Sequence, residues 1–322
     1  MTSPRVLCFG ILVADVFVPP LERLPDAGEL LTTDDFLIEP GGCAANVAIA
    51  LGRLGVPAAV GGRVGDDLFG EVVRRDLAAR DVDTRGILTT PGIGTSKTVI
   101  IPVVHEDRRY LHTFGANALL AAEDIAAIEL AAAEVIYIGG YLILPALRED
   151  ELVVRLAEAR ARGATVILDV AAPSGGHPSL AAVGRLLPQA DYFVPNLDEA
   201  RVLTGQADPK RQAELLVDHG AQTVMIKLGE DGLYVRSAQG RFELPAPPVE
   251  VVEPSGAGDA FAAGLALGIL EGWEIERTAR FASVIGGSAC TALGCAAGVF
   301  TRSEADEFLA AHPLPLRAGS AG

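Results

Sequence analysis

Cysteine, histidine and basic residues are scarce in this sequence, and each scarcity excludes a class of site. The 322 residues include four cysteines and five histidines. The cysteines show no metal-ligand spacing, no H-E-x-x-H is present, and every cysteine lies among apolar or small residues. A dedicated zinc site is therefore not expected, and reduced thiols predict a cytoplasmic protein.

Positive charge is also in deficit. The formal net charge is −16, whereas proteins that bind the phosphate backbone of nucleic acids need a basic surface. We therefore predict no nucleic-acid partner. Half of the residues are hydrophobic, which is enough to build a large core.

Segments that would target or anchor the chain at a membrane are not expected either. Residues 1–10 hold one arginine and a short apolar run, which is typical of a first strand rather than a signal peptide. Residues 282–301 carry no charge over a length that could span a bilayer, but they include four glycines and few leucines. We interpret them as a buried helix and the loop after it, and predict no membrane partner.

Two common nucleotide-binding fingerprints are missing. Residues 92–98, Gly-Ile-Gly-Thr-Ser-Lys-Thr, resemble a P-loop but lack the glycine immediately before the lysine, and an edge-like strand follows them. No G-x-G-x-x-G follows a predicted strand. Neither a P-loop nor a dinucleotide-binding turn is therefore predicted.

Short apolar segments alternate with amphipathic ones along most of the chain. This pattern predicts an α/β protein with a mainly parallel sheet covered on both faces. Strands are predicted at 5–10, 58–64, 97–104, 109–114, 134–138, 165–169, 192–194, 223–227 and 232–236. Helices are predicted at 43–54, 66–80, 123–133, 147–162, 179–187, 197–204, 209–219, 256–271 and 274–292. We expect a single domain over 1–312 and a disordered tail over 313–322.

The stretch 253–261, Glu-Pro-Ser-Gly-Ala-Gly-Asp-Ala-Phe, is the first of two glycine-rich helix starts. A turn of this kind directs backbone N–H groups outward at the positive end of a helix dipole, which favours an anion. Asp259 in the first helical turn is either a cap or dipole partner, or a base that takes a proton during phosphoryl transfer. The residue types alone leave both interpretations open.

The second helix start is Pro-Gly-Gly-Cys-Ala-Ala-Asn-Val-Ala at 40–48. Its two glycines could serve tight packing of a helix on a sheet, with Asn46 exposed. They could equally allow a polar ligand to approach the backbone, with Asn46 and Asp15 hydrogen-bonding its hydroxyls. The sequence alone favours neither.

Taken together, residues 40–55 and 253–264 resemble the ribokinase-like, phosphofructokinase-B type carbohydrate kinase family. Supporting matches lie at 61–70, 195–200 and 227–232, and the likeness runs roughly from Gly10 to Phe300. The resemblance implies a three-layer α/β/α ribokinase-like fold with a small β-sheet lid from about 12–38 and 95–115. In relatives the lid often serves as a dimer interface, so a homodimer through the lid is expected.

The resemblance also implies a role for each matching residue. It assigns the general base to Asp259 and the anion hole to the backbone amides of Gly256, Ala257 and Gly258. The residues implied to bind ATP are Asn196, Glu199, Lys227, Gly229 and Gly232, and two of these, Asn196 and Glu199, would also organise Mg²⁺, largely through water. Those implied to bind the acceptor are Asp15, Gly41, Gly42 and Asn46.

The chain also departs from the family pattern. Glu253 and Pro254 stand where the family usually has Asp-Thr, a pair that helps to hold a monovalent cation in ribokinase. The resemblance therefore implies ATP and Mg²⁺, while the departure at 253–254 leaves a monovalent cation open. Cys43 replaces a lysine of ribokinase, Val13 replaces an amide-bearing residue, and a ribose-contacting glutamate is replaced near 140–141. Ribose is therefore not implied as the acceptor.

The function predicted on these grounds is ATP-dependent phosphorylation of a hydroxyl on a small sugar or sugar-like acceptor. One alternative is a nucleoside kinase of the same family, favoured if Phe17, Phe114 or Tyr141 faces the pocket and can stack on a base. Another alternative, from a different class, is a non-catalytic ligand-binding protein on this fold.

Overall fold

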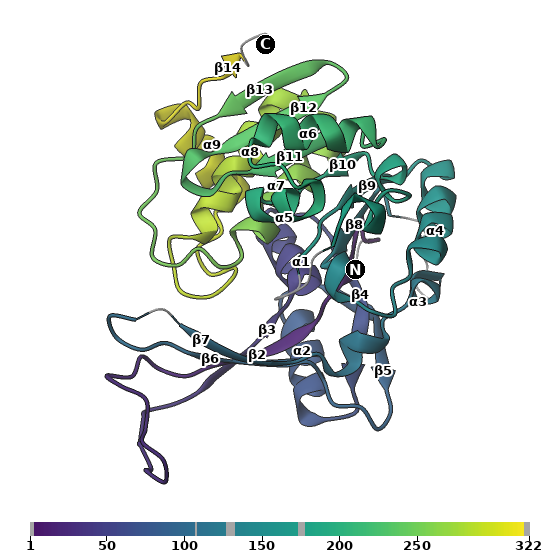
Figure 1. The fold of residues 1–322 in the computed structure, drawn as a ribbon. Coiled ribbons are helices and arrows are strands. Elements are labelled where there is room, and N and C mark those ends of the chain that lie inside the picture. The colour runs from purple at the N-terminus through teal and green to yellow at the C-terminus, as the bar shows by residue number, and fades with distance from the viewer. Residues whose placement is uncertain (1–2, 107, 127–132, 173–177, 319–322) are drawn as a thin grey trace.

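One large sheet forms the centre of the protein. The computed structural model describes residues 3–106, 108–126, 133–172 and 178–318. Within them the strands of the large sheet are β1 (Val6–Gly10), β4 (Ala58–Gly65), β5 (Asp83–Thr90), β8 (Val135–Gly139), β9 (Thr165–Leu168), β10 (Tyr192–Phe193), β11 (Thr223–Lys227), β12 (Leu233–Ser237), β13 (Gly240–Leu244) and β14 (Arg317–Ala318). Their spatial order is β14-β13-β12-β11-β10-β9-β8-β1-β4-β5 (Figure 1). In this spatial order, each pair of neighbours between β11 and β5 is parallel. The pairs β11–β12, β12–β13 and β13–β14 are antiparallel.

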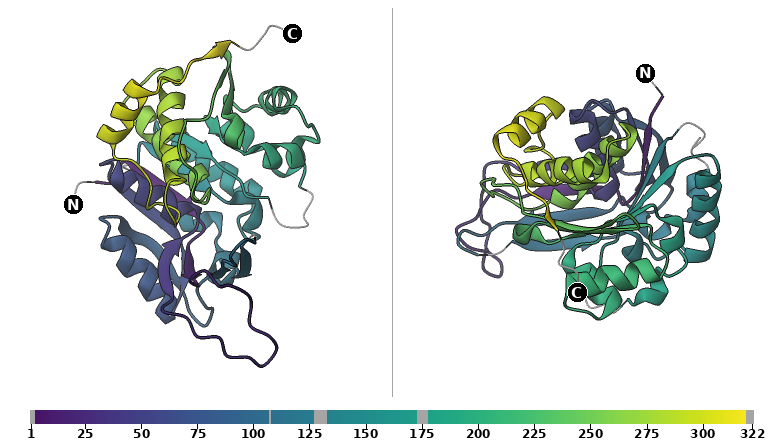
Figure 2. Two further views of the ribbon diagram at one scale, coloured as in Figure 1. Left: turned by 90° about the vertical axis from the view of Figure 1, so that its left-hand side faces the viewer. Right: turned by 90° about the horizontal axis from the view of Figure 1, so that it is seen from above.

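Helices cover both faces of this sheet (Figure 2). Side chains of β1 alternate between the two layers, because Val6 and Cys8 join one core cluster while Leu7 and Phe9 join the other. The first cluster includes residues of α1 (Cys43–Arg53), α2 (Leu68–Ala78), α7 (Ala257–Leu270), α8 (Ile275–Ala289) and α9 (Arg302–Ala311). The second includes residues of α3 (Ala122–Ala126), α4 (Glu149–Ala161), α5 (Leu197–Thr204) and α6 (Pro209–Asp218). The predicted three-layer architecture is thereby confirmed.

A second, four-stranded sheet projects from the main body (Figure 1). Its strands are β2 (Val13–Phe17), β3 (Leu37–Gly41), β6 (Lys97–Ile101) and β7 (Arg109–Thr113), in the order β3-β2-β6-β7. The hairpin predicted around residues 106–107 is β6–β7, and β2 joins it in parallel to β6. We call this sheet, with the connections between its strands, the lid.

The topology of the large sheet determines where a site can form. After β1 the chain builds β4 and β5 on one side, and then returns to place β8, β9, β10 and β11 on the other side. Such a reversal opens a crevice beyond the carboxyl ends of the central strands, where α/β proteins bind ligands. Asp169 follows β9 at this edge, and Lys227 ends β11 there.

Several predicted elements need correction. The helix predicted at 179–187 is wrong, because two short 3₁₀ turns at Leu180–Ala182 and Leu187–Gln189 replace it. Gly184 lowers helix propensity inside this segment, and Pro188 prevents a helix from continuing through it. The helix predicted at 123–133 is described only as α3, since residues 127–132 lie outside the described ranges.

Other elements were not predicted at all. They are β5, β13, α9 and β14, and β14 lies in the segment predicted to be a disordered tail. β5 is an edge strand, so its sequence shows less of the apolar character of a buried strand. The start of α9 did carry a signal, because Thr301 and Glu304 form a capping box.

No helix among the described residues is long and apolar enough to cross a membrane. The uncharged segment 282–301 divides between the end of α8 and the loop that follows it, as the interpretation of the sequence required.

Candidate active site

The glycine-rich turn before α7 begins the helix with a left-handed glycine. Gly256 caps the helix with φ 81°, a left-handed conformation that suits glycine. A Cβ built at this position would lie 2.1 Å from the carbonyl oxygen of Cys295, so no side chain fits there. The turn therefore leads into α7 with its backbone close against the loop after α8.

Asp259, in the first turn of α7, makes its hydrogen bond across the site to another helix. Its Oδ2 accepts a hydrogen bond from Asn46 Nδ2 of α1 at 2.8 Å. The two glycine-rich helix starts, more than 200 residues apart in sequence, thus meet through these side chains. This contact favours a role in the site over a role as a local helix cap.

The pKa of Asp259 is raised to about 7. Burial is the main cause, and the negative charge of Asp169 adds to it, while Asn46 and Lys227 oppose it. A carboxylate with such a pKa is a better proton acceptor at neutral pH than an ordinary aspartate.

Lys227 supplies positive charge beside this turn. Its Nζ lies 3.2 Å from Asp169 Oδ2, and a Cβ built on Gly258 would lie 3.1 Å from the same nitrogen. Burial lowers the pKa of Lys227, but Asp169, Glu199 and Asp259 outweigh burial and raise it. The ammonium group is therefore charged and lies next to the helix start.

Asp15 packs against Gly41, the first of the two glycines before α1. Asp15 in β2 is buried, and a Cβ on Gly41 would lie 1.9 Å from its Oδ2, so residue 41 must be glycine for Asp15 to occupy this place. Burial raises the pKa of Asp15 to about 6. The hydrogen bond from Thr98 lowers this pKa, and the negative charge of Glu39 adds a smaller increase. Gly42 is the N-cap of α1, which carries Asn46 toward Asp259.

Asn46 carries the clearest sign of a missing ligand. Its side chain is 5% exposed, and among the described residues its Oδ1 has no hydrogen-bond partner. A buried amide oxygen without a donor is costly, so the position is suited to a ligand hydroxyl or N–H group.

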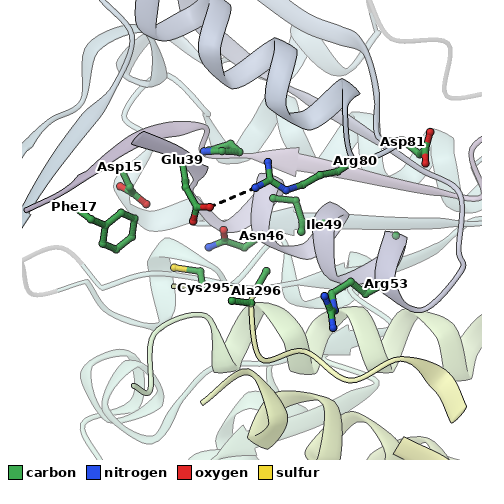
Figure 3. Close-up of a pocket in the computed structure, with 13 residues that line it drawn as sticks. Asp15, Phe17, Glu39, Asn46, Ile49, Arg53, Arg80, Asp81, Cys295 and Ala296 are labelled. Carbon is green, nitrogen blue, oxygen red and sulfur yellow. Dashed lines mark hydrogen bonds and ion pairs between the residues drawn. The ribbon is translucent and has the colours of Figure 1, made fainter. Parts of the chain in front are cut away.

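Two cavities adjoin the two helix starts. The first, of about 390 Å³, is lined by Asp15, Phe17, Glu39, Asn46, Arg53, Arg80 and Cys295 among others (Figure 3). Within this lining, Arg80 Nη2 lies 3.5 Å from Glu39 Oε1. The second, of about 830 Å³, is lined by Asn196, Lys227, Gly229, Gly232, Ala257 and Gly258 among others. Asn46 lines the first cavity and Ala257 and Gly258 line the second, so the hydrogen bond between Asn46 and Asp259 links the two.

Asn196 and Glu199 have a structural role that the sequence reading did not assign. Asn196 Oδ1 accepts from the Glu199 N–H at 2.8 Å, and Glu199 Oε2 accepts from the Asn196 N–H at 2.7 Å, which makes a capping box on α5. The pKa of Glu199 is nevertheless raised to about 7, by burial and then by the charge of Asp169. The capping box accounts for the conformation of this pair, and the neighbouring charges place Glu199 within the same electrostatic cluster as Asp259.

Asp169 is the member of the site that sequence reasoning missed. It accepts hydrogen bonds from Lys227 Nζ and from the Tyr137 hydroxyl, the latter at 3.3 Å. Its position at the carboxyl end of the strand predicted at 165–169 was an available signal, because ligand-binding side chains gather at the carboxyl ends of parallel strands.

The architecture and this cluster can now be compared with known proteins. A model of the pfkB family of carbohydrate kinases matches residues 3–302. The chain belongs to this family. ATP and Mg²⁺ are the cofactors of ribokinase-family enzymes.

Curated proteins and a solved structure that are similar to this pfkB-family kinase agree with the family assignment. The ribokinase of Haemophilus influenzae is 29% identical over 288 residues, which cover 88% of this chain and 91% of that protein. The ATP-dependent ribose-1-phosphate kinase of Halopiger xanaduensis is 30% identical over 283 residues, which cover 88% and 90%. The structure of Arabidopsis thaliana ribokinase complexed with ribose and ATP matches with a TM-score of 0.81 at 23% identity, over 96% of this chain and 99% of that one. At this identity the last likeness concerns the fold, and it confirms the predicted ribokinase-like fold.

Proposed function

We propose that this pfkB-family kinase transfers the terminal phosphoryl group of ATP to a hydroxyl of a small, neutral sugar or sugar-like acceptor. The observation that carries the proposal is the position of Asp259. It lies in the first turn of a glycine-started helix and has a pKa raised to about 7. It is hydrogen-bonded to Asn46, which lines one cavity, and follows Ala257 and Gly258, which line the other. A proton acceptor beside an anion site is the combination that phosphoryl transfer to an alcohol requires.

In the proposed mechanism, the backbone amides of residues 256–258 and the positive end of α7 stabilise the charge on the transferring group. Asp259 accepts the proton of the attacking hydroxyl as the new phosphate ester bond forms and the bond from the phosphorus to the leaving oxygen breaks. Asn46 holds the Asp259 carboxylate through its 2.8 Å hydrogen bond. Lys227, next to Gly258, contributes a fixed positive charge on the side of the leaving group.

The larger cavity is the proposed nucleotide site. Its volume of about 830 Å³ lies within the range of sites that bind drug-sized ligands, and Lys227, Gly229 and Gly232 line it. Lys227 would face the phosphates, and the two glycines would leave the backbone open to the nucleotide.

The charge around this cavity fits a divalent cation. The carboxylates of Asp169, Glu199 and Asp259 interact with one another and with one cation, Lys227. Among the described residues no group of three histidine, cysteine or acidic side chains is placed to hold a metal by itself. Glu199 and Asn196 would therefore hold Mg²⁺ largely through water, and the bound ion would neutralise charge on the nucleotide phosphates.

The smaller cavity is the proposed acceptor site. Asp15, Glu39 and the Asn46 Oδ1 offer acceptor atoms for hydroxyl groups. Arg53 and Arg80 also line the cavity, but Asp15, Glu39 and Asp81 leave the lining with no excess of positive charge for an anionic acceptor. A neutral polyol of pentose or hexose size is therefore the acceptor that this lining favours.

A nucleoside acceptor is the second candidate. Phe17 lines the acceptor cavity beside Asp15, where its ring could stack on a base (Figure 3). Tyr141, by contrast, is buried in the core, and Phe114 is exposed and is not part of this lining. The nucleoside reading therefore depends on Phe17.

ADP release by the purified protein, measured across pentoses, hexoses and nucleosides with Mg²⁺ and ATP, tests the proposal. We expect turnover with at least one neutral sugar, and a loss of about 10²- to 10⁴-fold in kcat for Asp259→Asn. Turnover with nucleosides alone would favour the second candidate. No turnover with any acceptor, or near-normal kcat in Asp259→Asn, would contradict the assigned chemistry.

We further propose that two copies associate through the lid. Strand β7 is the edge of the lid sheet, and all five of its residues are exposed, including Tyr110 at 52% and Leu111 at 65%. An exposed edge strand with apolar side chains is a template for pairing with another chain. A second copy would cover this edge.

A further inference from the structure

An ion pair links the lid to the turn that begins α7. Arg108 directly precedes β7 in the lid, and its Nη1 contacts Glu253 Oε1, three residues before Gly256. Both side chains are largely shielded from solvent, with 23% of Arg108 and 6% of Glu253 exposed. The pair therefore joins two parts of the site that are distant in sequence.

Glu253 also holds the turn itself. Its Oε1 accepts from the Ser255 N–H at 3.1 Å, and its Oε2 accepts from the Gly294 N–H at 3.2 Å. The backbone N–H of Glu253 donates to Cys290 O at 3.0 Å. Since Gly256 packs against the carbonyl of Cys295, the same loop after α8 supports both ends of residues 253–256.

The lid arginine has a clear electrostatic effect on this acid. Burial raises the pKa of Glu253, but hydrogen bonds from Ser255, Arg108 and Gly294 outweigh burial, and the net pKa is lowered. Glu253 is therefore ionised, in a cleft that it shares with two other acids, Asp35 and Glu39, and with apolar side chains such as Phe17. An ionised carboxylate in such a place is unfavourable when its cationic partner leaves.

We propose that Arg108 and Glu253 are positioning residues for phosphoryl transfer, an inference that rests on the function proposed above. From the lid, Arg108 holds Glu253, and Glu253 holds Ser255 and the following amides in place for the transferring group. The position of the lid is thereby linked to the geometry of the anion site, although neither residue touches the reacting atoms.

The matched comparison is between neighbouring lid arginines. Arg109 is also ion-paired, but to the exposed Glu106 inside the lid. We expect Arg108→Ala to lower kcat by about 10- to 100-fold, less than or comparable to removing one anion-hole donor. Arg108→Lys should recover most of this loss, and Arg109→Ala should stay near wild type. The ATP dissociation constant should be unchanged, which a general folding defect would not allow, whereas the melting temperature of Arg108→Ala should fall because Glu253 loses its partner.

A double-mutant cycle identifies the partner. If Arg108 acts through Glu253, the loss of kcat in Arg108→Ala combined with Glu253→Gln should be no larger than in the more impaired single variant. Losses that multiply, or equal effects of Arg108→Ala and Arg109→Ala, would overturn the proposal.

Amide hydrogen exchange tests the coupling without turnover. In the protein without ligands, Arg108→Ala should speed exchange at Ser255 and Gly294, whereas Arg109→Ala should not. Unchanged exchange in Arg108→Ala would overturn the inference even if the kinase is active. Faster exchange in a protein that phosphorylates no acceptor would instead overturn the proposed function and leave the link between lid and turn in place.

Discussion

At the scale of single residues, the environment of Asp259 determines the chemistry. An aspartate ordinarily titrates near pH 4, and here burial raises its pKa to about 7. The same residue type in the first turn of a solvated helix would be a cap and a weak base. What distinguishes Asp259 is its contact with Asn46 and its position beside Asp169 and Lys227.

A pH profile follows from this pKa. Asp259 must be ionised to accept a proton, and its ionised fraction falls as the pH drops below about 7. We therefore expect log kcat/KM to fall with a slope of about one per pH unit on the acid side and to level off above neutrality.

Asp15, with its pKa raised to about 6, provides the control for that profile. Asp15→Asn should raise KM for the acceptor but keep the acid limb near 7. An acid limb near pH 4 in the wild-type protein, or a limb that disappears in Asp15→Asn, would contradict the assignment of the base.

At the scale of elements, the start of α7 depends on a glycine for two reasons at once. Gly256 adopts a left-handed conformation, and its position lies against the Cys295 carbonyl. Gly272, just after α7, is also left-handed at φ 64°, but a Cβ there would meet nothing within 4 Å. A side chain at Gly272 would therefore add backbone strain alone, whereas one at Gly256 would add both backbone strain and steric crowding.

Gly256→Ala and Gly272→Ala test this distinction. We expect Gly272→Ala to cost about 1–2 kcal/mol of unfolding free energy, the usual cost of a left-handed alanine, with kcat retained. Gly256→Ala should cost more and should also lower kcat, because the turn must move away from Cys295. Chemical denaturation and steady-state kinetics measure both effects. Equal stability losses with unchanged kcat in both variants would show that the position of the turn does not matter.

At the scale of the whole molecule, the lid presents an exposed edge strand, β7. The proposed dimer through β7 predicts that Leu111→Asp shifts the protein to monomer in sedimentation or light-scattering measurements, because a charge would be buried at the pairing edge. Val154→Asp, on the exposed side of α4 and remote from the lid, is the matched control and should leave the mass unchanged (Figure 1). A wild-type monomer, or a dimer that survives Leu111→Asp, would contradict the interface.

The sequence by itself determined the two helix starts and most of the elements around them. Helix α5 and strand β11 have the bounds that the pattern predicted, and α1 begins where its two glycines indicated, because periodicity and glycine placement are local properties. The strand β5 and the 3₁₀ turns near 180–189 were not predictable in the same way, since an edge position and a broken helix depend on what packs nearby.

Only the tertiary structure decided which charges meet. The contacts of Asn46 with Asp259, Lys227 with Asp169 and Arg108 with Glu253 join residues 213, 58 and 145 positions apart. No local pattern specifies such pairs, and burial, which raises the pKa of Asp259, exists only in the folded chain. The sequence could therefore indicate that residues 253–259 start a helix suited to an anion, while folding alone gave Asp259 its basicity and connected the turn to the lid.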